Sequence, residues 1–310
     1  MEGTWTFFLV CATLSVLIGI PANILALVFF LSGKGGPLRE VTKLMYVAIS
    51  GTDLILAVSL IPFLLELVSP FTFYSPTNPR VVCELAEYAL ETCPRVSYSL
   101  VCLLAVVKAA LIHSPLRPVS ASGIRRTLMV LIVFLLLQST IPILFRYAVN
   151  PSPPPPCDPS LHKLTFTEKD LARAWYGITV LLQTSLPMLV LLAANTLSIY
   201  HLLRNLDNTS PLHVEKRRAA QTTLMLTMVY FALHVTGVVY ATCSVLGYRV
   251  NLDSNIANGM IYLTPAVQPW VYFFRMRELM SFYQNKYRRI SQLRAQQQFM
   301  EMKQTSITSQ

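Results

Sequence analysis

The sequence predicts an all-α fold: a seven-transmembrane helix bundle with a short amphipathic membrane-surface helix after the seventh span. Three observations predict it: seven long apolar stretches, short segments between most of them, and a composition that is 54% hydrophobic and 13% charged. About 20 apolar helical residues cross about 30 Å of hydrocarbon, and a soluble domain would carry about a quarter charged residues. The predicted spans are Trp5–Leu31, Leu44–Leu67, Cys83–Ala110, Ile124–Phe145, Trp175–His201, Ala219–Leu246 and Ile256–Phe274.

Each span carries polar or kinking residues that a helix facing only lipid would not keep. In chain order they include Asn23, Asp53, Pro94, Pro187, His234 and Gln268. A proline removes a backbone donor, so Pro94 should kink the third span. Only Met1 to Thr4 precede the first span, without a leader that ends in a cleavage site, so we expect this helix to be retained.

The charge distribution predicts the topology. The segments after the first, third and fifth spans and the tail, counted with the adjoining ends of the third and fourth spans, hold 18 of the 25 Lys and Arg residues. By the positive-inside rule these parts are cytoplasmic and the amino terminus is extracellular. The net charge of +10 is therefore a topology signal and does not indicate nucleic-acid binding.

The chain divides into three parts by composition. Residues 1–274 form the predicted bundle. Residues 275–290 alternate basic and apolar side chains, which predicts an amphipathic helix on the membrane surface and contact with membrane lipid. Residues 291–310 are polar and are expected to be a disordered cytoplasmic tail.

The six cysteines suggest one disulfide. Cys83 opens the third span and Cys157 lies in the segment after the fourth, so the topology puts both on the oxidising side, and we pair them. The other four lie inside spans, where a cysteine is usually a small buried hydrophobic residue.

An ionisable side chain inside the membrane is costly and is a functional hypothesis by default. Asp53 stands in the middle of the second span and needs a partner. Asn23, Gln268 and Tyr272 are the polar groups expected at matching depth. A sodium ion at Asp53 is one option, and no other cofactor is expected.

Glu84, Glu87 and Glu91 share one face of the outer third span, with Arg95 four residues after Glu91. They form either a water-facing stripe in which Glu91 pairs with Arg95, or an acidic anchor for an amine or other cationic ligand, with Glu66 nearby. His234 is either a ligand contact or a hydrogen-bonded interior histidine, and tyrosines including Tyr230 would supply aromatic walls. The ligand-contact hypothesis comprises Glu87, Leu90, Glu91, Arg95, His234 and Tyr262.

These features together resemble the rhodopsin-like G protein-coupled receptors over nearly the whole chain. The resemblance rests on Asn23, Asp53, Pro62, Cys83, Pro187 and the segment Gln268-Pro269-Trp270-Val271-Tyr272. Lys108 follows Cys83 by 25 residues, the family's spacing between its bridging cysteine and the arginine of its Asp-Arg-Tyr motif. The resemblance implies a receptor whose inner mouth admits a helix of a Gα subunit. Lys108, Arg126, Lys216 and Arg218 are the expected contacts, although positive-inside charge alone also explains them.

The chain departs from the family pattern at its activation motifs. Val107-Lys108-Ala109 stands where the family has Asp-Arg-Tyr, and Leu233-His234-Val235-Thr236 stands where it has Cys-Trp-x-Pro. The seventh-span asparagine of the family is Gln268 here. These changes put the usual activation switch in doubt.

Two segments point to chemosensory branches. The seventh span and its exit, Thr264 to Glu278, resemble odorant receptors, whereas Cys102 to Ala109 and Arg218 to Thr222 are similar to vomeronasal type-1 receptors. We therefore expect a plasma-membrane receptor that transduces a small-molecule or small peptide ligand to a heterotrimeric G protein. An atypical receptor that binds ligand without coupling and an ion-coupled transporter are the alternatives. An enzyme is not expected, because the sequence shows no paired nucleophile and base and no metal-spaced histidines.

Overall fold

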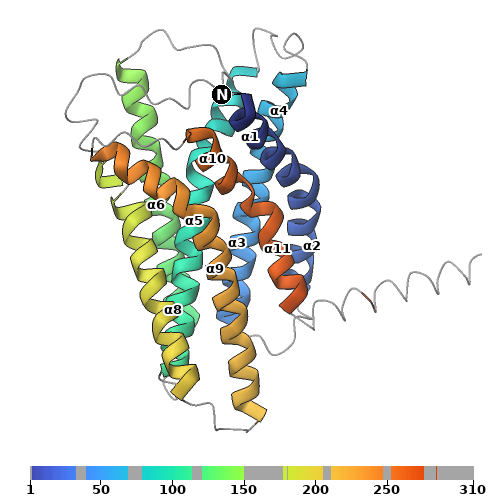
Figure 1. Cartoon of the computed structure of the whole chain (residues 1–310), viewed down its shortest axis with the longest axis vertical. Helices are drawn as coiled ribbons and strands as arrows, with labels where there is room; N and C mark the ends of the chain where they lie inside the picture. The colour runs from blue at the N-terminus through green and yellow to red at the C-terminus, as the bar shows by residue number, and fades with distance from the viewer. Residues whose placement is uncertain are drawn as a thin grey trace, which may run out of the picture.

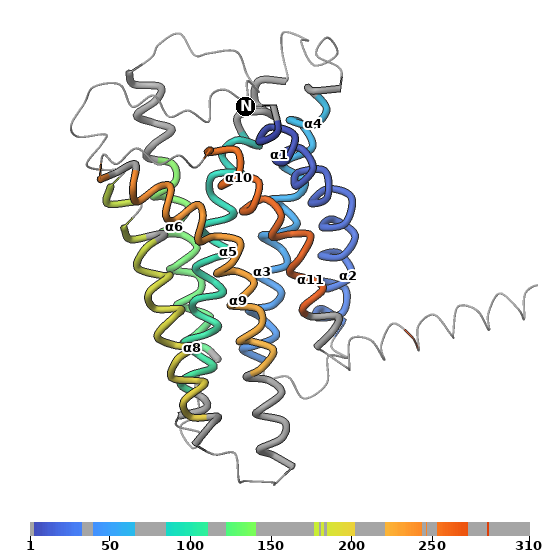
Figure 2. Tube along the Cα trace, viewed as in Figure 1, coloured from blue at the N-terminus to red at the C-terminus, as the bar shows by residue number. Residues whose placement is uncertain are grey.

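The structure, a computed structural model, describes residues 2–32, 40–68, 79–113, 121–149, 177–179, 181–204, 211–246, 253–275 and 284. Over these residues the chain is helical apart from turns and one cap residue (Figures 1 and 2). The all-α prediction is confirmed. Residues 276–310, apart from Gln284, lie outside the described residues, so the predicted surface helix and disordered tail stay predictions.

The helices fall where the seven spans are predicted. The elements are α1 (Glu2–Leu14), η1 (Ser15–Gly19) and α2 (Ile20–Leu31) for the first span; α3 (Glu40–Ser59) and α4 (Ile61–Val68) for the second; α5 (Pro79–His113) and α6 (Ala121–Val149) for the third and fourth; η3 (Leu181–Ser185) and α8 (Leu186–Arg204) for the fifth; α9 (Pro211–Val245) for the sixth; and α10 (Ser254–Tyr262) and α11 (Thr264–Arg275) for the seventh. Over the described residues, five helical segments are by themselves long and apolar enough to cross a membrane. The fifth span is shorter in its described part, and the seventh is divided at Leu263.

Prolines account for the interruptions. The π-helical turn η1 ends two residues before Pro21, η3 ends two residues before Pro187, and the turns at Leu60 and Leu263 each precede a proline by two residues. A proline supplies no N–H to the carbonyl four residues earlier, so the helix widens or breaks just before it. Pro94 and Pro269 differ, because α5 continues through Pro94 and α11 continues through Pro269, each as one α-helix.

The third span lies at the centre of the bundle. α5 packs against α3, α6, α8 and α9, and Figure 1 shows it among them. A large apolar core surrounds it, and a smaller core joins Phe8, Leu60, Leu90 and Tyr262 at the end of the bundle where α1 begins. Many large apolar side chains elsewhere are exposed, which fits a surface covered by lipid.

Candidate functional site

A cluster of four buried polar side chains joins four spans. Asp53 comes from α3, Ser97 from α5, Tyr230 from α9 and Gln268 from α11, and each is at most 1% exposed. We call this set the central polar cluster. Buried polar groups need hydrogen-bond partners, and here each partner comes from a different span.

The hydroxyl of Tyr230 lies in the middle of the central polar cluster. Ser97 donates a 2.6 Å hydrogen bond to Asp53 Oδ1, and the Tyr230 hydroxyl lies 3.5 Å from the same oxygen. The Tyr230 hydroxyl also hydrogen-bonds with the Gln268 side-chain amide and with the Ser97 hydroxyl. The sixth span is thus held to the second, third and seventh spans through one hydroxyl group.

Asn23 has a different role from the one expected. Its Nδ2 donates to the carbonyls of Gly19 and Pro265, both at 2.9 Å, so it ties the first span to the seventh. Ser15 supports the same junction by donating to the Tyr262 carbonyl. Gln268 is linked to Asp53 through Tyr230, and the side chain of Tyr272 lies outside the described residues.

Sequence reasoning missed the direct partners of Asp53. The sequence does not identify Ser97, and it predicts Tyr230 in an aromatic wall, whereas the Tyr230 hydroxyl lies in the central polar cluster. The available signal was small: Ser97 and Tyr230 are polar groups in the middle of apolar spans. The depth of a residue in the membrane does not show toward which neighbouring helix its side chain faces.

His234 lies one helical turn after Tyr230 and is buried. Its ring stacks between Tyr230 and Tyr98, with centroids at 5.1 Å and 5.2 Å and planes tilted by 10° in each case. Its Nδ1 lies 3.0 Å from the Tyr230 carbonyl. These are the contacts of an interior histidine, one of the two interpretations left open, and they place His234 against the central polar cluster.

A ladder of polar contacts continues along the same face of α9. Thr227 donates a 3.0 Å hydrogen bond to Asn195 on α8, and Thr223 hydrogen-bonds with Tyr46 on α3. Positions 223, 227 and 230 are spaced i, i+4 and i+7, which places them on one helix face. The part of α9 between Pro211 and Tyr230 is therefore tied to the second and fifth spans.

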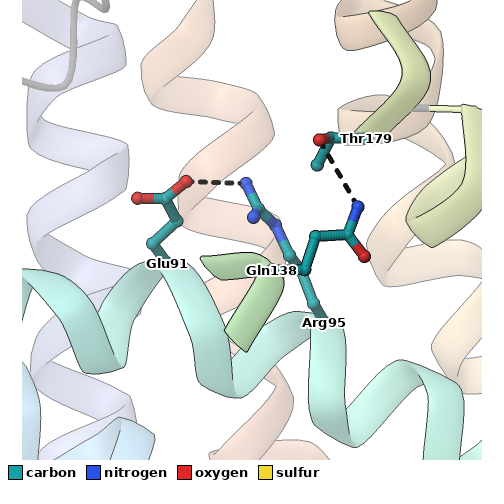
Figure 3. Close-up of polar contacts among 4 residues, drawn as sticks. All are labelled: Glu91, Arg95, Gln138 and Thr179. Carbon is teal, nitrogen blue, oxygen red and sulfur yellow. Dashed lines mark hydrogen bonds and ion pairs between the residues drawn. The ribbon is translucent and has the colours of Figure 1, made fainter. Parts of the chain in front are cut away.

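Figure 3 shows two polar pairs, one within α5 and one that joins α6 to Thr179. Arg95 Nη2 donates to Glu91 Oε1 at 2.8 Å, the pairing expected for a water-facing stripe. Gln138 Nε2 on α6 donates to Thr179 Oγ1 at 3.5 Å. Leu90 and Tyr262 pack in the smaller core, and the half-buried Glu87 lies within electrostatic range of Tyr262, as does Glu91.

The expected inner contacts are described only in part. Lys108 is half-buried near the end of α5, and Arg126 is exposed near the start of α6. Arg125, beside Arg126, pairs with Glu40 at 3.2 Å with both side chains exposed. The side chains of Lys216, Arg218, Glu66, Glu84 and Cys83, and all of Cys157, lie outside the described residues. Cys11, Cys93, Cys102 and Cys243 are free thiols.

Asp53 Oδ2 is the remaining acceptor of the central polar cluster. It is buried and has no hydrogen-bond partner among the described residues, and the same holds for the Ser50 hydroxyl one turn earlier on α3. Carboxylate and hydroxyl oxygens are ligands that suit a small hard cation. Clusters of three or more His, Cys, Asp or Glu side chains that could bind a metal are absent from the described part.

Comparison with known proteins identifies the class. The model of the 7 transmembrane receptor (rhodopsin family) matches residues 22–272, which include all four residues of the central polar cluster. The chain therefore belongs to the rhodopsin family of seven-transmembrane receptors, and its bundle is a multi-pass membrane domain. In a comparison with curated proteins, none matched this chain.

Proposed function

We propose that this receptor is chemosensory, lies in the plasma membrane with its amino terminus outside, and passes the binding of a small extracellular ligand to a heterotrimeric G protein. The observation that carries the proposal is the position of Tyr230 among three other spans. A ligand that binds better when the sixth span is displaced shifts the population toward that state. His234 transmits this effect, since it stacks on Tyr230 and on Tyr98 of α5.

The ligand contacts in this proposal lie between the amino-terminal end and the middle of the bundle. They comprise Glu87, Leu90, Glu91, Arg95, His234 and Tyr262. Leu90 and Tyr262 share the smaller core, and Arg95 precedes Ser97 of the central polar cluster by two residues. A bridge between Cys83 and Cys157 would hold the segment after the fourth span near the start of α5.

The opposite end of the bundle is proposed to meet the G protein. Lys108, Arg126, Lys216 and Arg218 would line the site for the carboxyl-terminal helix of a Gα subunit, a helix-in-groove contact.

One sequence feature favours a second candidate function, an atypical receptor that binds ligand without coupling. In Val107-Lys108-Ala109 a lysine replaces the family's arginine, and lysine lacks the planar fork of guanidinium donors.

Lys108→Arg separates coupling from non-coupling. We expect the wild type to catalyse nucleotide exchange on a purified promiscuous Gα subunit, and Lys108→Arg to raise the rate about tenfold, because a guanidinium makes more hydrogen bonds than an ammonium. Exchange would be measured with receptor in lipid nanodiscs, and Arg125→Lys, at an exposed site, is the control. A silent wild type with an active Lys108→Arg variant supports the atypical receptor, and silence of both contradicts coupling through this surface.

Asp53→Asn tests the sodium hypothesis. Asparagine keeps the shape of Asp53 but removes the charge that would hold a cation, so basal nucleotide exchange should depend on sodium in the wild type and not in the variant. Exchange would be compared in sodium chloride and in N-methyl-D-glucamine chloride at equal ionic strength, which keeps charge screening constant. Equal sodium dependence of the two proteins would show that Asp53 does not hold the ion.

A further inference from the structure

Tyr46 links the second and sixth spans at a depth different from that of the central polar cluster. Its hydroxyl hydrogen-bonds with Thr223 on α9, and both side chains are buried. Tyr46 precedes Asp53 by seven residues, and Thr223 precedes Tyr230 by seven. Seven residues are about two helical turns, or about 10 Å along a helix axis, and they bring a side chain back to nearly the same face. The two spans are therefore joined at two depths by matching faces.

Long side chains make these two links because the backbones of α3 and α9 are not close neighbours. Over the described residues α9 packs mainly against α5, α8, α10 and α11. Tyr46 reaches across from α3, and Tyr230 reaches across from α9. The ring of Tyr46 is held in place by Phe30 of α2, on which it stacks with centroids at 5.2 Å and planes tilted by 20°. Tyr46 thus lies across the bundle on the side of the central polar cluster where α3 and α9 begin.

A second contact on this side of the cluster joins the sixth span to the fifth. Thr227 Oγ1 lies 3.0 Å from Asn195 Oδ1 and 2.8 Å from the Leu224 carbonyl oxygen. One hydroxyl proton cannot serve both acceptors. When the amide is turned by 180°, its N–H group donates to Thr227 and Thr227 donates to its own helix. Either orientation of the amide keeps one hydrogen bond between α8 and α9.

We infer that the hydrogen bonds of Tyr46 with Thr223 and of Thr227 with Asn195 hold the cytoplasmic end of the bundle closed. We call these two bonds the inner lock. The inference rests on the proposed coupling function and specifies what holds its resting state. A partner helix is about 10–12 Å in diameter with its side chains. For such a helix to enter, the beginning of α9 must move away from α3 and α8, and both bonds must break.

The chemistry of the inner lock suits a contact that has to open. Its four side chains are uncharged, and each can bond to water when the sixth span moves away. One hydrogen bond exchanged for water changes an equilibrium by about two- to tenfold. A buried ion pair at this place would resist separation more strongly, because each charge would be left without its partner. Two neutral bonds favour the closed arrangement and still allow it to open.

A cysteine reporter measures opening without a G protein. Leu226 lies between Thr223 and Thr227 in sequence and is completely buried. In a Leu226→Cys background, the rate of labelling by N-ethylmaleimide follows the fraction of open receptor when opening and closing are faster than labelling. Full-length receptor in lipid nanodiscs would be labelled, and the rate of the wild type, which has only the native thiols, would be subtracted.

Three variants test the inner lock in this background. Tyr46→Phe, Thr223→Val and Thr227→Val each remove one hydroxyl and keep the shape of the side chain, and each should raise the labelling rate about two- to tenfold. Tyr46→Phe combined with Thr223→Val should do no more than either change alone, since both remove the same bond. Tyr46→Phe combined with Thr227→Val should multiply the two effects. The thermal midpoint checks folding, and Thr223→Val tests the same bond if Tyr46→Phe folds poorly.

Tyr200→Phe and Thr196→Val on α8 are the matched controls and should leave labelling unchanged. Tyr200 is exposed, and the Thr196 hydroxyl donates to the Leu192 carbonyl of its own helix. Basal nucleotide exchange would be measured on the same samples. Faster labelling with silent exchange supports the inner lock and contradicts the coupling proposal.

Two results would overturn the inner lock, whatever the result for exchange. The first is labelling of both Tyr46→Phe and Thr223→Val at the rate of the reporter background. The second is a double variant in which these two changes multiply, because they would then act on packing separately and not on one shared bond.

Discussion

Tyr230→Phe is expected to raise ligand-independent nucleotide exchange by about 5- to 150-fold. The substitution removes one hydroxyl and leaves the ring that stacks on His234. The hydroxyl hydrogen-bonds with Ser97 and Gln268 and lies near Asp53. Buried hydrogen bonds contribute about 0.5–1.5 kcal/mol each, so losing this group weakens the closed arrangement by about 1–3 kcal/mol. A loss of about 1–3 kcal/mol corresponds to a change of about 5- to 150-fold in the equilibrium between the closed and open arrangements, when the open arrangement lacks these hydrogen bonds.

Tyr98→Phe is the matched control for Tyr230→Phe. Tyr98 stacks on the other face of His234, and its buried hydroxyl has no hydrogen-bond partner among the described residues. Removing an unsatisfied hydroxyl should leave exchange unchanged and should not lower stability. The measurement is basal nucleotide exchange at matched receptor amounts, with the thermal midpoint as a check on folding. Equal exchange in the wild type and Tyr230→Phe would show that this hydroxyl does not hold the sixth span.

The course of the helices could be predicted because it depends on local properties. Apolar length fixed the positions of the spans, and the prolines Pro21, Pro62, Pro187 and Pro265 lie two residues after each interruption. Pro94 and Pro269 differ from these four prolines, because α5 and α11 continue through them as α-helices. A proline kink is a bend within a continuous helix, so the kink predicted at Pro94 stays a prediction.

Contacts within one helix could also be predicted, whereas contacts between helices could not. Glu91 and Arg95 are four residues apart, so helical geometry alone brings them together. Asp53 and Tyr230 are 177 residues apart, and their contact depends on how two helices are rotated. Because Asn23 lies at the same predicted depth as Asp53, the sequence predicts that the two side chains are partners. In the structure the Asn23 Nδ2 donates to the backbone of the seventh span. Rotation about the helix axis, which sequence depth does not give, decided this point.

The largest loss of folded receptor is expected from Gly19→Val. A Cβ atom at Gly19 would lie 3.0 Å from the carbonyl carbon and oxygen of Pro265 and 3.1 Å from its Cβ. Two of these three atoms belong to the backbone of Pro265, which cannot rotate away as a flexible side chain can. The first and seventh spans must therefore separate. Overpacking of this kind costs about 1–3 kcal/mol for small additions, and valine adds two methyl groups beyond the Cβ.

Separation of these two spans would also break their hydrogen bonds. Asn23 donates to the Pro265 carbonyl at 2.9 Å, and Ser15 donates to the Tyr262 carbonyl, both from residues within one turn of Gly19. We therefore expect Gly19→Val to lower surface expression and the thermal midpoint strongly, and Gly19→Ala to lower them less. Gly51→Ala is the control, because a Cβ there meets nothing within 4 Å, and it should be neutral or stabilising by up to about 1 kcal/mol. If Gly19→Val kept the surface expression of Gly51→Ala, close contact at Gly19 would not be what joins the first span to the seventh.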